Sequence, residues 1–191
     1  MMERTFGDRS AMAPIGVDPG GADPVDTDPG GVDRLAGDRS GIEHKPIDRE
    51  AIAALVPHSG DMVLLDRVVS WDVSGITCLT RSHLDPANPL RRAGRLAATC
   101  GIEYALQAAA LHGALAAGGV AQPAGFLAAL RDVTLYADRL DDPAIGDLHV
   151  HARLERHENG GLIYAFELRS QSNRLLLSGR AIIALPRVQR A

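Results

Sequence analysis

The stretch from residue 101 to residue 113, with the sequence GIEYALQAAALHG, constrains the fold more than any other part of this chain. It has strong helical propensity and is apolar on nearly all sides, which is typical of a helix buried inside a domain. At about 100° per residue, Glu103 and Gln107 lie on one face of such a helix, whereas His112 lies on roughly the opposite side. We therefore predict a buried helix on which Glu103 and Gln107 belong to one site and His112 does not.

Composition excludes several classes of function. The 191 residues are 46% apolar and carry a formal net charge of −4, which is ordinary for a globular protein and unlike a nucleic-acid binder. No apolar run is long and uninterrupted enough to cross a membrane, and the first residues do not resemble a signal peptide. Cys78 and Cys100 show neither metal-ligand spacing nor a disulfide framework. We expect a cytoplasmic protein that requires no metal and no cofactor.

The first part of the chain differs in composition from the rest. Residues 1–41 are rich in Asp, Gly and Pro, contain the sequence DPGG twice, and have few apolar residues to bury. Such a segment is predicted to be disordered. The ordered domain is therefore expected to span residues 42–191.

Within that domain, a short helix capped by Asp48 is expected first, followed by a hairpin of strands at residues 62–71 and 76–81. After the central helix, alternating apolar residues predict strands at 126–136, 148–156, 162–170 and 175–185, the last three joined by short turns. An antiparallel sheet wrapped around one long buried helix is the simplest arrangement of these elements. The predicted class is α+β.

Two motifs in this order resemble a known family. Residues 55–68, LVPHSGDMVLLDRV, are similar to the LPHRxxMLLLDxV opening of the hotdog-fold β-hydroxyacyl-ACP dehydratases of the FabZ and ApeP kind. Residues 101–107, GIEYALQ, are similar to the GIEYMAQ motif in their central helix. The resemblance covers residues 47–187. It implies a hotdog fold that dehydrates a 3-hydroxyacyl thioester on an acyl carrier protein, in fatty-acid or polyene-type biosynthesis, and a homodimer or a heterodimer with another hotdog subunit.

One departure narrows the resemblance. The FabZ branch carries its catalytic histidine in a His-Phe-Pro-Gly motif before the helix glutamate, and this sequence has Pro89 at the corresponding position. The chain is thus more similar to the aryl-polyene ApeP branch, which implies a catalytic pair of His58 and Glu103. His83 remains a second candidate for the histidine.

The chemistry agrees with this pair. Eliminating water from a 3-hydroxyacyl thioester requires a base for the C2 proton and an acid for the C3 hydroxyl, and an imidazole with a carboxyl group can fill both roles. The backbone amides of Gly101 and Ile102, at the expected helix N-terminus, are suited to polarise the thioester carbonyl. Gln107, one turn further, is expected to orient Glu103 by a hydrogen bond.

Three arginines precede the central helix, namely Arg91, Arg92 and Arg95. Carrier proteins are acidic, so these side chains are expected to dock one by charge complementarity, although a simple solvated loop explains them equally well. His149 and His151 share one face of a strand without a third ligand, which argues against a metal site.

Two other functions fit the same sequence. In a hotdog thioesterase, Glu103 would activate water and His58 would be dispensable. In a non-catalytic subunit, the chain would complete the sheet of an active hotdog partner. The absence of the His-Phe-Pro-Gly motif keeps the second alternative open.

Overall fold

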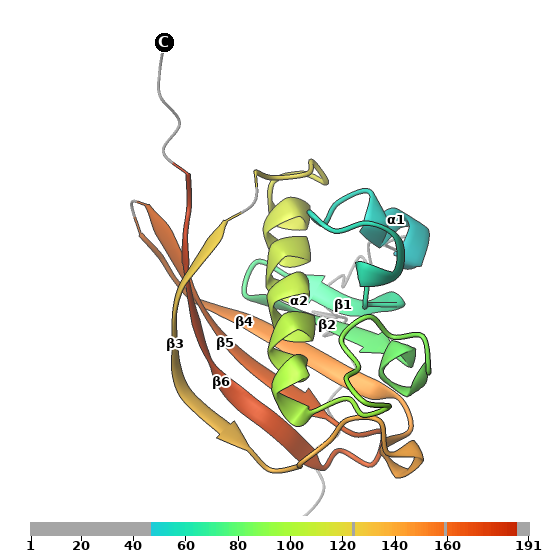
Figure 1. Ribbon diagram of the computed structural model, residues 1–191. Helices are drawn as coiled ribbons and strands as arrows, with labels where there is room; N and C mark the ends of the chain where they lie inside the picture. Colours follow the sequence, from blue (N-terminus) through green and yellow to red (C-terminus); the bar gives the residue numbers. More distant parts are fainter. Residues whose placement is uncertain (1–46, 124, 159, 187–191) are drawn as a thin grey trace, which may run out of the picture. The chain divides into compact units, whose positions relative to one another are not determined.

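The computed structural model describes residues 47–123, 125–158 and 160–186 (Figure 1). The predicted disordered segment, residues 1–41, lies outside the described residues, so its disorder and the domain boundary after it remain predictions.

Six antiparallel strands form one sheet in the order β1-β2-β4-β5-β6-β3. The first hairpin is β1 (Arg67–Asp72) with β2 (Gly75–Thr80), and a meander follows of β4 (Leu148–Glu158), β5 (Gly161–Arg169) and β6 (Leu175–Ala184). Two non-consecutive pairings complete the sheet: β2 with β4, and β6 with β3 (Phe126–Leu135). The predicted hairpin and meander are both confirmed, and β3 forms one edge of the sheet.

The central helix α2 spans Gly101–Ala116 and follows a 3-10 turn at Ala98–Cys100. Figure 1 shows the sheet curving around this helix. Its alanines permit close approach to the sheet, where they meet inward-facing residues of the strands. The buried residues of this core include Tyr104, Ala105, Ala108, Leu111, Val150, Ala152, Tyr164, Phe166 and Leu168. The hotdog architecture predicted from the sequence is confirmed.

The helix is not buried on every side, however. Ile102, Leu106, Ala110 and Gly113 are only half-buried, and they recur at the spacing of one helical face. Three residues of this face, Leu106, Ala110 and Gly113, line a cavity. None of the helices in the described part of the chain is long and apolar enough to cross a membrane.

The segment before β1 differs from its prediction. Helix α1 (Arg49–Ala53) begins as expected, with the Asp48 carboxylate accepting a hydrogen bond from the Ala51 amide. The predicted strand at 62–71 starts only at Arg67, since Gly60–Met62 is a 3-10 turn and residues 63–66 form no strand, although the Asp66 amide already donates to the Leu79 carbonyl in β2. Further 3-10 turns lie at Ser82–Leu84 and Pro143–Ile145. Leu64 is fully buried. Its backbone N–H and carbonyl form hydrogen bonds with side chains, where a strand residue would bond to the backbone of a neighbouring strand.

Candidate active site

His58 and Glu103 meet in the structure although 44 residues separate them in the chain. His58 follows Pro57 after α1, and Glu103 lies in the first turn of α2. His58 Nε2 lies 3.0 Å from Glu103 Oε1, and the two side chains are 26% and 29% exposed. The other ring nitrogen, Nδ1, is buried and has no hydrogen-bond partner among the described residues. The imidazole and the carboxyl group therefore lie within ion-pair distance of each other at the edge of a cavity.

Gln107, one turn beyond Glu103, holds this pair in place. Its amide Nε2 donates to Glu103 Oε1 at 3.1 Å and to the Met62 carbonyl at 2.8 Å. Its Oε1 accepts from the Leu64 amide at 2.9 Å. Gln107 is fully buried, so these bonds are shielded from competing water. One carboxamide thus orients Glu103 and fixes the segment that follows His58.

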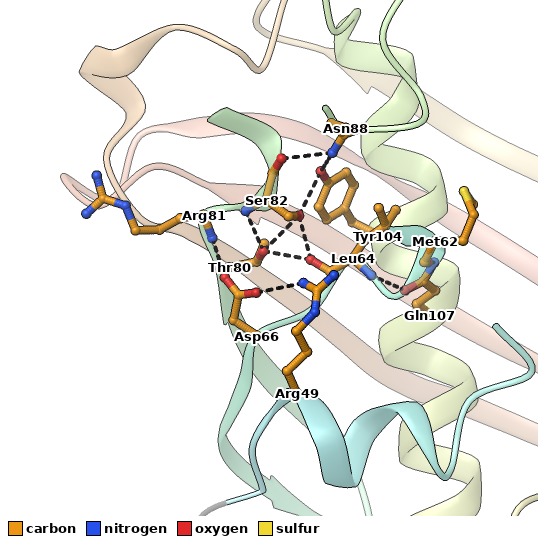
Figure 2. Close-up of polar contacts among 10 residues, drawn as sticks. All are labelled: Arg49, Met62, Leu64, Asp66, Thr80, Arg81, Ser82, Asn88, Tyr104 and Gln107. Atoms are coloured by element: carbon orange, nitrogen blue, oxygen red, sulfur yellow. Dashed lines mark hydrogen bonds and ion pairs between the residues drawn. The ribbon is translucent and has the colours of Figure 1, made fainter. Parts of the chain in front are cut away.

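A second set of polar contacts fixes the same segment from the other side (Figure 2). The Leu64 carbonyl accepts from Thr80 Oγ1 and from Ser82 Oγ, each at 2.6 Å. The Tyr104 hydroxyl accepts from Asn88 Nδ2 at 2.8 Å and lies 3.1 Å from Ser82 Oγ. Burial raises the pKa of Tyr104 to about 12, so this phenol stays protonated. Tyr104, which follows Glu103 on α2, therefore anchors the loop before the helix.

Asp66 closes this network. Its carboxylate accepts from Arg49 Nη1 at 3.1 Å and from the Arg81 amide at 2.7 Å, which joins α1 to the end of β2 (Figure 2). Sequence reasoning did not assign roles to these residues, because their partners come from distant segments. The only signal was that Asp66 and Tyr104 stand inside the two family motifs.

The catalytic candidates open onto an apolar cavity of about 610 Å³. One wall is a face of α2, and the opposite wall comes from the start of β3, the β4–β5 hairpin and the end of β6. Pockets that are mostly apolar with a few convergent polar groups are typical of small-molecule sites. The apolar lining includes Leu55, Leu106, Ala110, Gly113, Ala117, Leu127, Leu154, Leu162, Ile183 and Leu185.

His112 reaches the wall of this cavity but has a structural role. Its Nε2 donates to the Asp72 carbonyl at 2.8 Å, so its Nδ1 accepts from the Tyr164 hydroxyl at 2.6 Å. Burial raises the pKa of Tyr164 to about 12, so the hydroxyl keeps its proton. Both ring nitrogens of His112 are occupied. The prediction that His112 lies away from the site of Glu103 is wrong, because both residues line this cavity.

The remaining histidines lie elsewhere. His83 is fully buried in the turn Ser82–Leu84 and does not line the cavity. Burial lowers its pKa to about 4, although the neighbouring Gly146 backbone opposes the shift. His149 and His151 stack on β4 with ring centroids 6.3 Å apart, and His151 Nδ1 bonds to Thr77 Oγ1. The described residues contain no cluster of His, Cys, Asp and Glu suited to a metal.

The contacts of Gly101 do not fit the use expected of its amide, whereas the role of the Ile102 amide stays a prediction. Gly101 is buried, and its backbone N–H donates to the carbonyls of Ala98 and Thr99 in the preceding 3-10 turn. A Cβ at this position would lie 2.7 Å from Leu168 Cδ2. The glycine therefore permits helix packing against the sheet, and its amide is not free for a substrate. Ile102 does not line the cavity either.

The three arginines before α2 do not form one docking surface. Arg91 is only 16% exposed, pairs with Asp141 at 3.3 Å and donates to the Gly94 carbonyl, so it holds the loop together. Arg92 donates to the carbonyls of Pro89 and Arg91 in its own loop. Arg95, which is exposed, lines a separate cleft of about 750 Å³ that Arg139 and Arg174 also line.

Comparisons with known proteins agree with the architecture and the motifs. Residues 50–190 match the family model of ApeP-like proteins, described as ApeP dehydratase. Among solved structures, the dehydratase heterocomplex ApeI:P from Xenorhabdus doucetiae is similar, with 18% identity, a TM-score of 0.61, and 72% of this chain and 91% of that chain covered. Zebra fish thioesterase superfamily member 2 is similar with 14% identity, a TM-score of 0.51, and 72% and 93% covered. No curated protein matches the sequence.

Proposed function

Because the chain belongs to the ApeP-like dehydratase family, we propose that it dehydrates a 3-hydroxyacyl thioester bound to an acyl carrier protein, giving the 2-enoyl thioester. The observation that carries this proposal is the 3.0 Å contact between His58 and Glu103 at an apolar cavity. A proton acceptor and a proton donor beside an apolar pocket are what an elimination from an acyl chain requires.

In the proposed reaction, neutral His58 takes the proton from C2, and protonated Glu103 gives its proton to the hydroxyl on C3. The C2–H and C3–O bonds break, the double bond forms between C2 and C3, and water leaves. His58 is then cationic and Glu103 anionic. The 3.0 Å separation of the two groups lets the proton return from imidazole to carboxylate, which restores the starting state without another residue.

A carrier protein would present the substrate at the N-terminal end of α2. The cleft lined by Arg95, Arg139 and Arg174 also includes Thr99, one helical turn before Glu103. We assign carrier docking to Arg95, which lines this cleft and donates to the Asp138 carbonyl beside it. We withdraw Arg91 and Arg92, because both bond within their own loop and neither lines the cleft. Acidic surfaces of carrier proteins would complement this arginine side.

We further propose that the chain works as a dimer, either with itself or with a second hotdog subunit, in the cytoplasm. Strand β3 is an edge strand with large exposed apolar side chains: Phe126, Leu127, Leu130, Val133 and Leu135. An uncovered apolar edge of this kind favours pairing with another strand. The similar structure from Xenorhabdus doucetiae is a heterocomplex, which supports a second subunit here.

A hotdog thioesterase is the second candidate, because the fold is shared with a thioesterase superfamily member. In that reaction Glu103 would activate a water molecule, and free thiol would appear in place of an enoyl product. A non-catalytic subunit would give neither product.

The test is to incubate the full chain, alone and with a candidate hotdog partner, with a 3-hydroxyacyl group on carrier protein or pantetheine. Intact-mass analysis follows the loss of one water, and a thiol reagent follows hydrolysis. We expect loss of water without release of thiol. Release of thiol would establish the thioesterase, and no change with either preparation would support the non-catalytic subunit.

A further inference from the structure

Gly113 lies in the last third of α2 and has no explanation within the fold. Its backbone is helical, and a Cβ placed on it would meet no atom within 4 Å. Glycine in a helix interior destabilises the helix relative to alanine, because it loses more backbone entropy on folding. At Gly101 packing against Leu168 requires the glycine, but no described neighbour requires it at Gly113.

The open space beside Gly113 belongs to the cavity that contains His58 and Glu103. Gly113 is ten residues beyond Glu103, which corresponds to about 15 Å along the helix axis. Beyond Leu106, every residue that α2 contributes to the cavity, apart from His112, is alanine or glycine. The wall of the cavity formed by α2 therefore lacks large side chains along this length.

The buried polar groups in this part of the cavity wall are already bonded, and the other polar residues there, Gln122 and His157, are exposed at its rim. His112 and Tyr164 bond to each other, and His112 also bonds to the Asp72 carbonyl. The facing residues Leu127, Leu154, Leu162 and Ile183 are apolar. A ligand in this space would contact branched apolar side chains on one side and mainly alanine and glycine of α2 on the other. A straight hydrocarbon chain suits such a space, because it is apolar and unbranched.

We propose that Gly113 is a specificity-determining residue, which keeps the cavity open for the distal part of a long, unbranched acyl chain whose reacting end lies at His58 and Glu103. This inference rests on the proposed function and adds the substrate class. A side chain at position 113 would block the chain at a set distance from Glu103 while leaving the reacting end accessible.

The variants are Gly113→Ala, Gly113→Leu and, as a control for an added surface leucine, Ala53→Leu on the exposed side of α1. Since a Cβ at position 113 meets no atom, both Gly113 variants should fold. Gly113→Ala should raise the melting temperature by about 2–4 °C, through its higher helix propensity.

Activity is compared on 3-hydroxybutanoyl and 3-hydroxyhexadecanoyl pantetheine, since only the longer chain reaches about 15 Å beyond the reacting carbons. We expect Gly113→Leu to keep kcat/KM on the short substrate within about twofold and to lose roughly tenfold or more on the long one. Ala53→Leu should match the wild type on both. Equal losses on both substrates, or no loss on the long one, would overturn the inference. A change of oligomeric state in Gly113→Leu by light scattering would also overturn it, because a partner side chain would then be the occupant.

A binding experiment separates this inference from the proposed reaction. Calorimetry with unreactive butyl and hexadecyl thioethers of pantetheine should show that the wild type prefers the long chain and that Gly113→Leu loses the preference. If the wild type binds in this way but forms no enoyl product, the proposed function fails and the role of Gly113 stands. If the wild type shows no preference for the long thioether, the role of Gly113 fails whatever the activity.

Discussion

At the scale of single residues, the site depends on one buried carboxamide. Gln107 bonds to Glu103 in the same helix and to the backbone of Met62 and Leu64, which lie more than 40 residues away. The contact with Glu103 follows from helical spacing and could be predicted from the sequence. The contacts with Met62 and Leu64 could not, because nothing local specifies which distant backbone groups a side chain will satisfy.

The first prediction concerns this residue. Gln107→Leu keeps a similar volume but leaves the buried Leu64 amide without its acceptor. We expect the free energy of unfolding to fall by about 1–3 kcal/mol, as for other unpaired buried groups, and dehydration to fall as well because Glu103 loses its orientation. Urea denaturation measures the first effect. Gln122→Leu, at an exposed glutamine, is the matched control. Unchanged stability in Gln107→Leu would contradict the assigned contacts.

The second prediction concerns Asp141, whose side chain is 1% exposed between Arg91 and Arg139. Hydrogen bonds from Arg139 lower the pKa of Asp141 to about 2 from 3.8. The stabilisation is therefore complete above about pH 4 and is lost as the pH falls towards 2. Because Arg139 is half-exposed, we expect a contribution of at most about 2 kcal/mol.

Acid denaturation of the wild type and of Asp141→Asn measures this contribution, with exposed Asp61→Asn as the control. Asp141→Asn should be the less stable protein at pH 7 and should lose less stability than the wild type between about pH 4 and pH 2. Parallel acid curves for all three proteins would show that Asp141 contributes nothing.

At the scale of elements, the spacing of apolar residues and the positions of turn-forming residues predicted most of the secondary structure. The strands β2 to β6 and both helices lie within a few residues of their predicted positions. Residues 63–66 were misassigned to a strand because their run of apolar residues looks the same whether the neighbour is a strand or a helix. The cavity along α2 was missed for a related reason: apolar residues on all sides predict burial, but they also suit a face that meets an apolar ligand.

The third prediction concerns β3. Placing charges on its exposed apolar residues, as in Val133→Glu with Leu135→Glu, should prevent another strand from covering this edge. We expect light scattering to show a dimer for the wild type and a monomer for the double variant. Val73→Glu, at an exposed valine in the β1–β2 turn, is the control and should stay dimeric. A wild-type monomer at micromolar concentration, both alone and with a hotdog partner, would refute the dimer.

At the scale of the whole molecule, the order of elements and two short motifs were enough to predict the hotdog architecture. They were not enough to predict the non-consecutive pairings β2–β4 and β3–β6, which depend on how the sheet curves around α2. The resemblance named His58 and Glu103 as a pair, and the two lie next to each other. The roles expected of Gly101 from its place at the helix N-terminus and of Arg91 from its charge do not fit their contacts. Both are conspicuous in the sequence for reasons of packing and charge pairing inside the fold.

The fourth prediction concerns the composition of residues 1–41, which offer little apolar surface for burial. A chain that begins at residue 42 should therefore fold with the same melting temperature as the full chain. Thermal denaturation followed by circular dichroism makes the comparison. A fall of more than a few degrees in the truncated chain would show that this segment contributes to the stability of the domain.

The central claim is that His58 and Glu103 act as one catalytic unit, and the most direct test compares dehydration rates of the wild type, His58→Ala, Glu103→Gln and the double variant. Each single variant should lose about 10²-fold or more, the usual scale of general acid–base catalysis. The double variant should be little worse than either, because residues that act as a unit are strongly non-additive. Wild-type dehydration in both single variants would contradict the account, and a loss in Glu103→Gln alone, accompanied by thioester hydrolysis in His58→Ala, would identify a thioesterase instead.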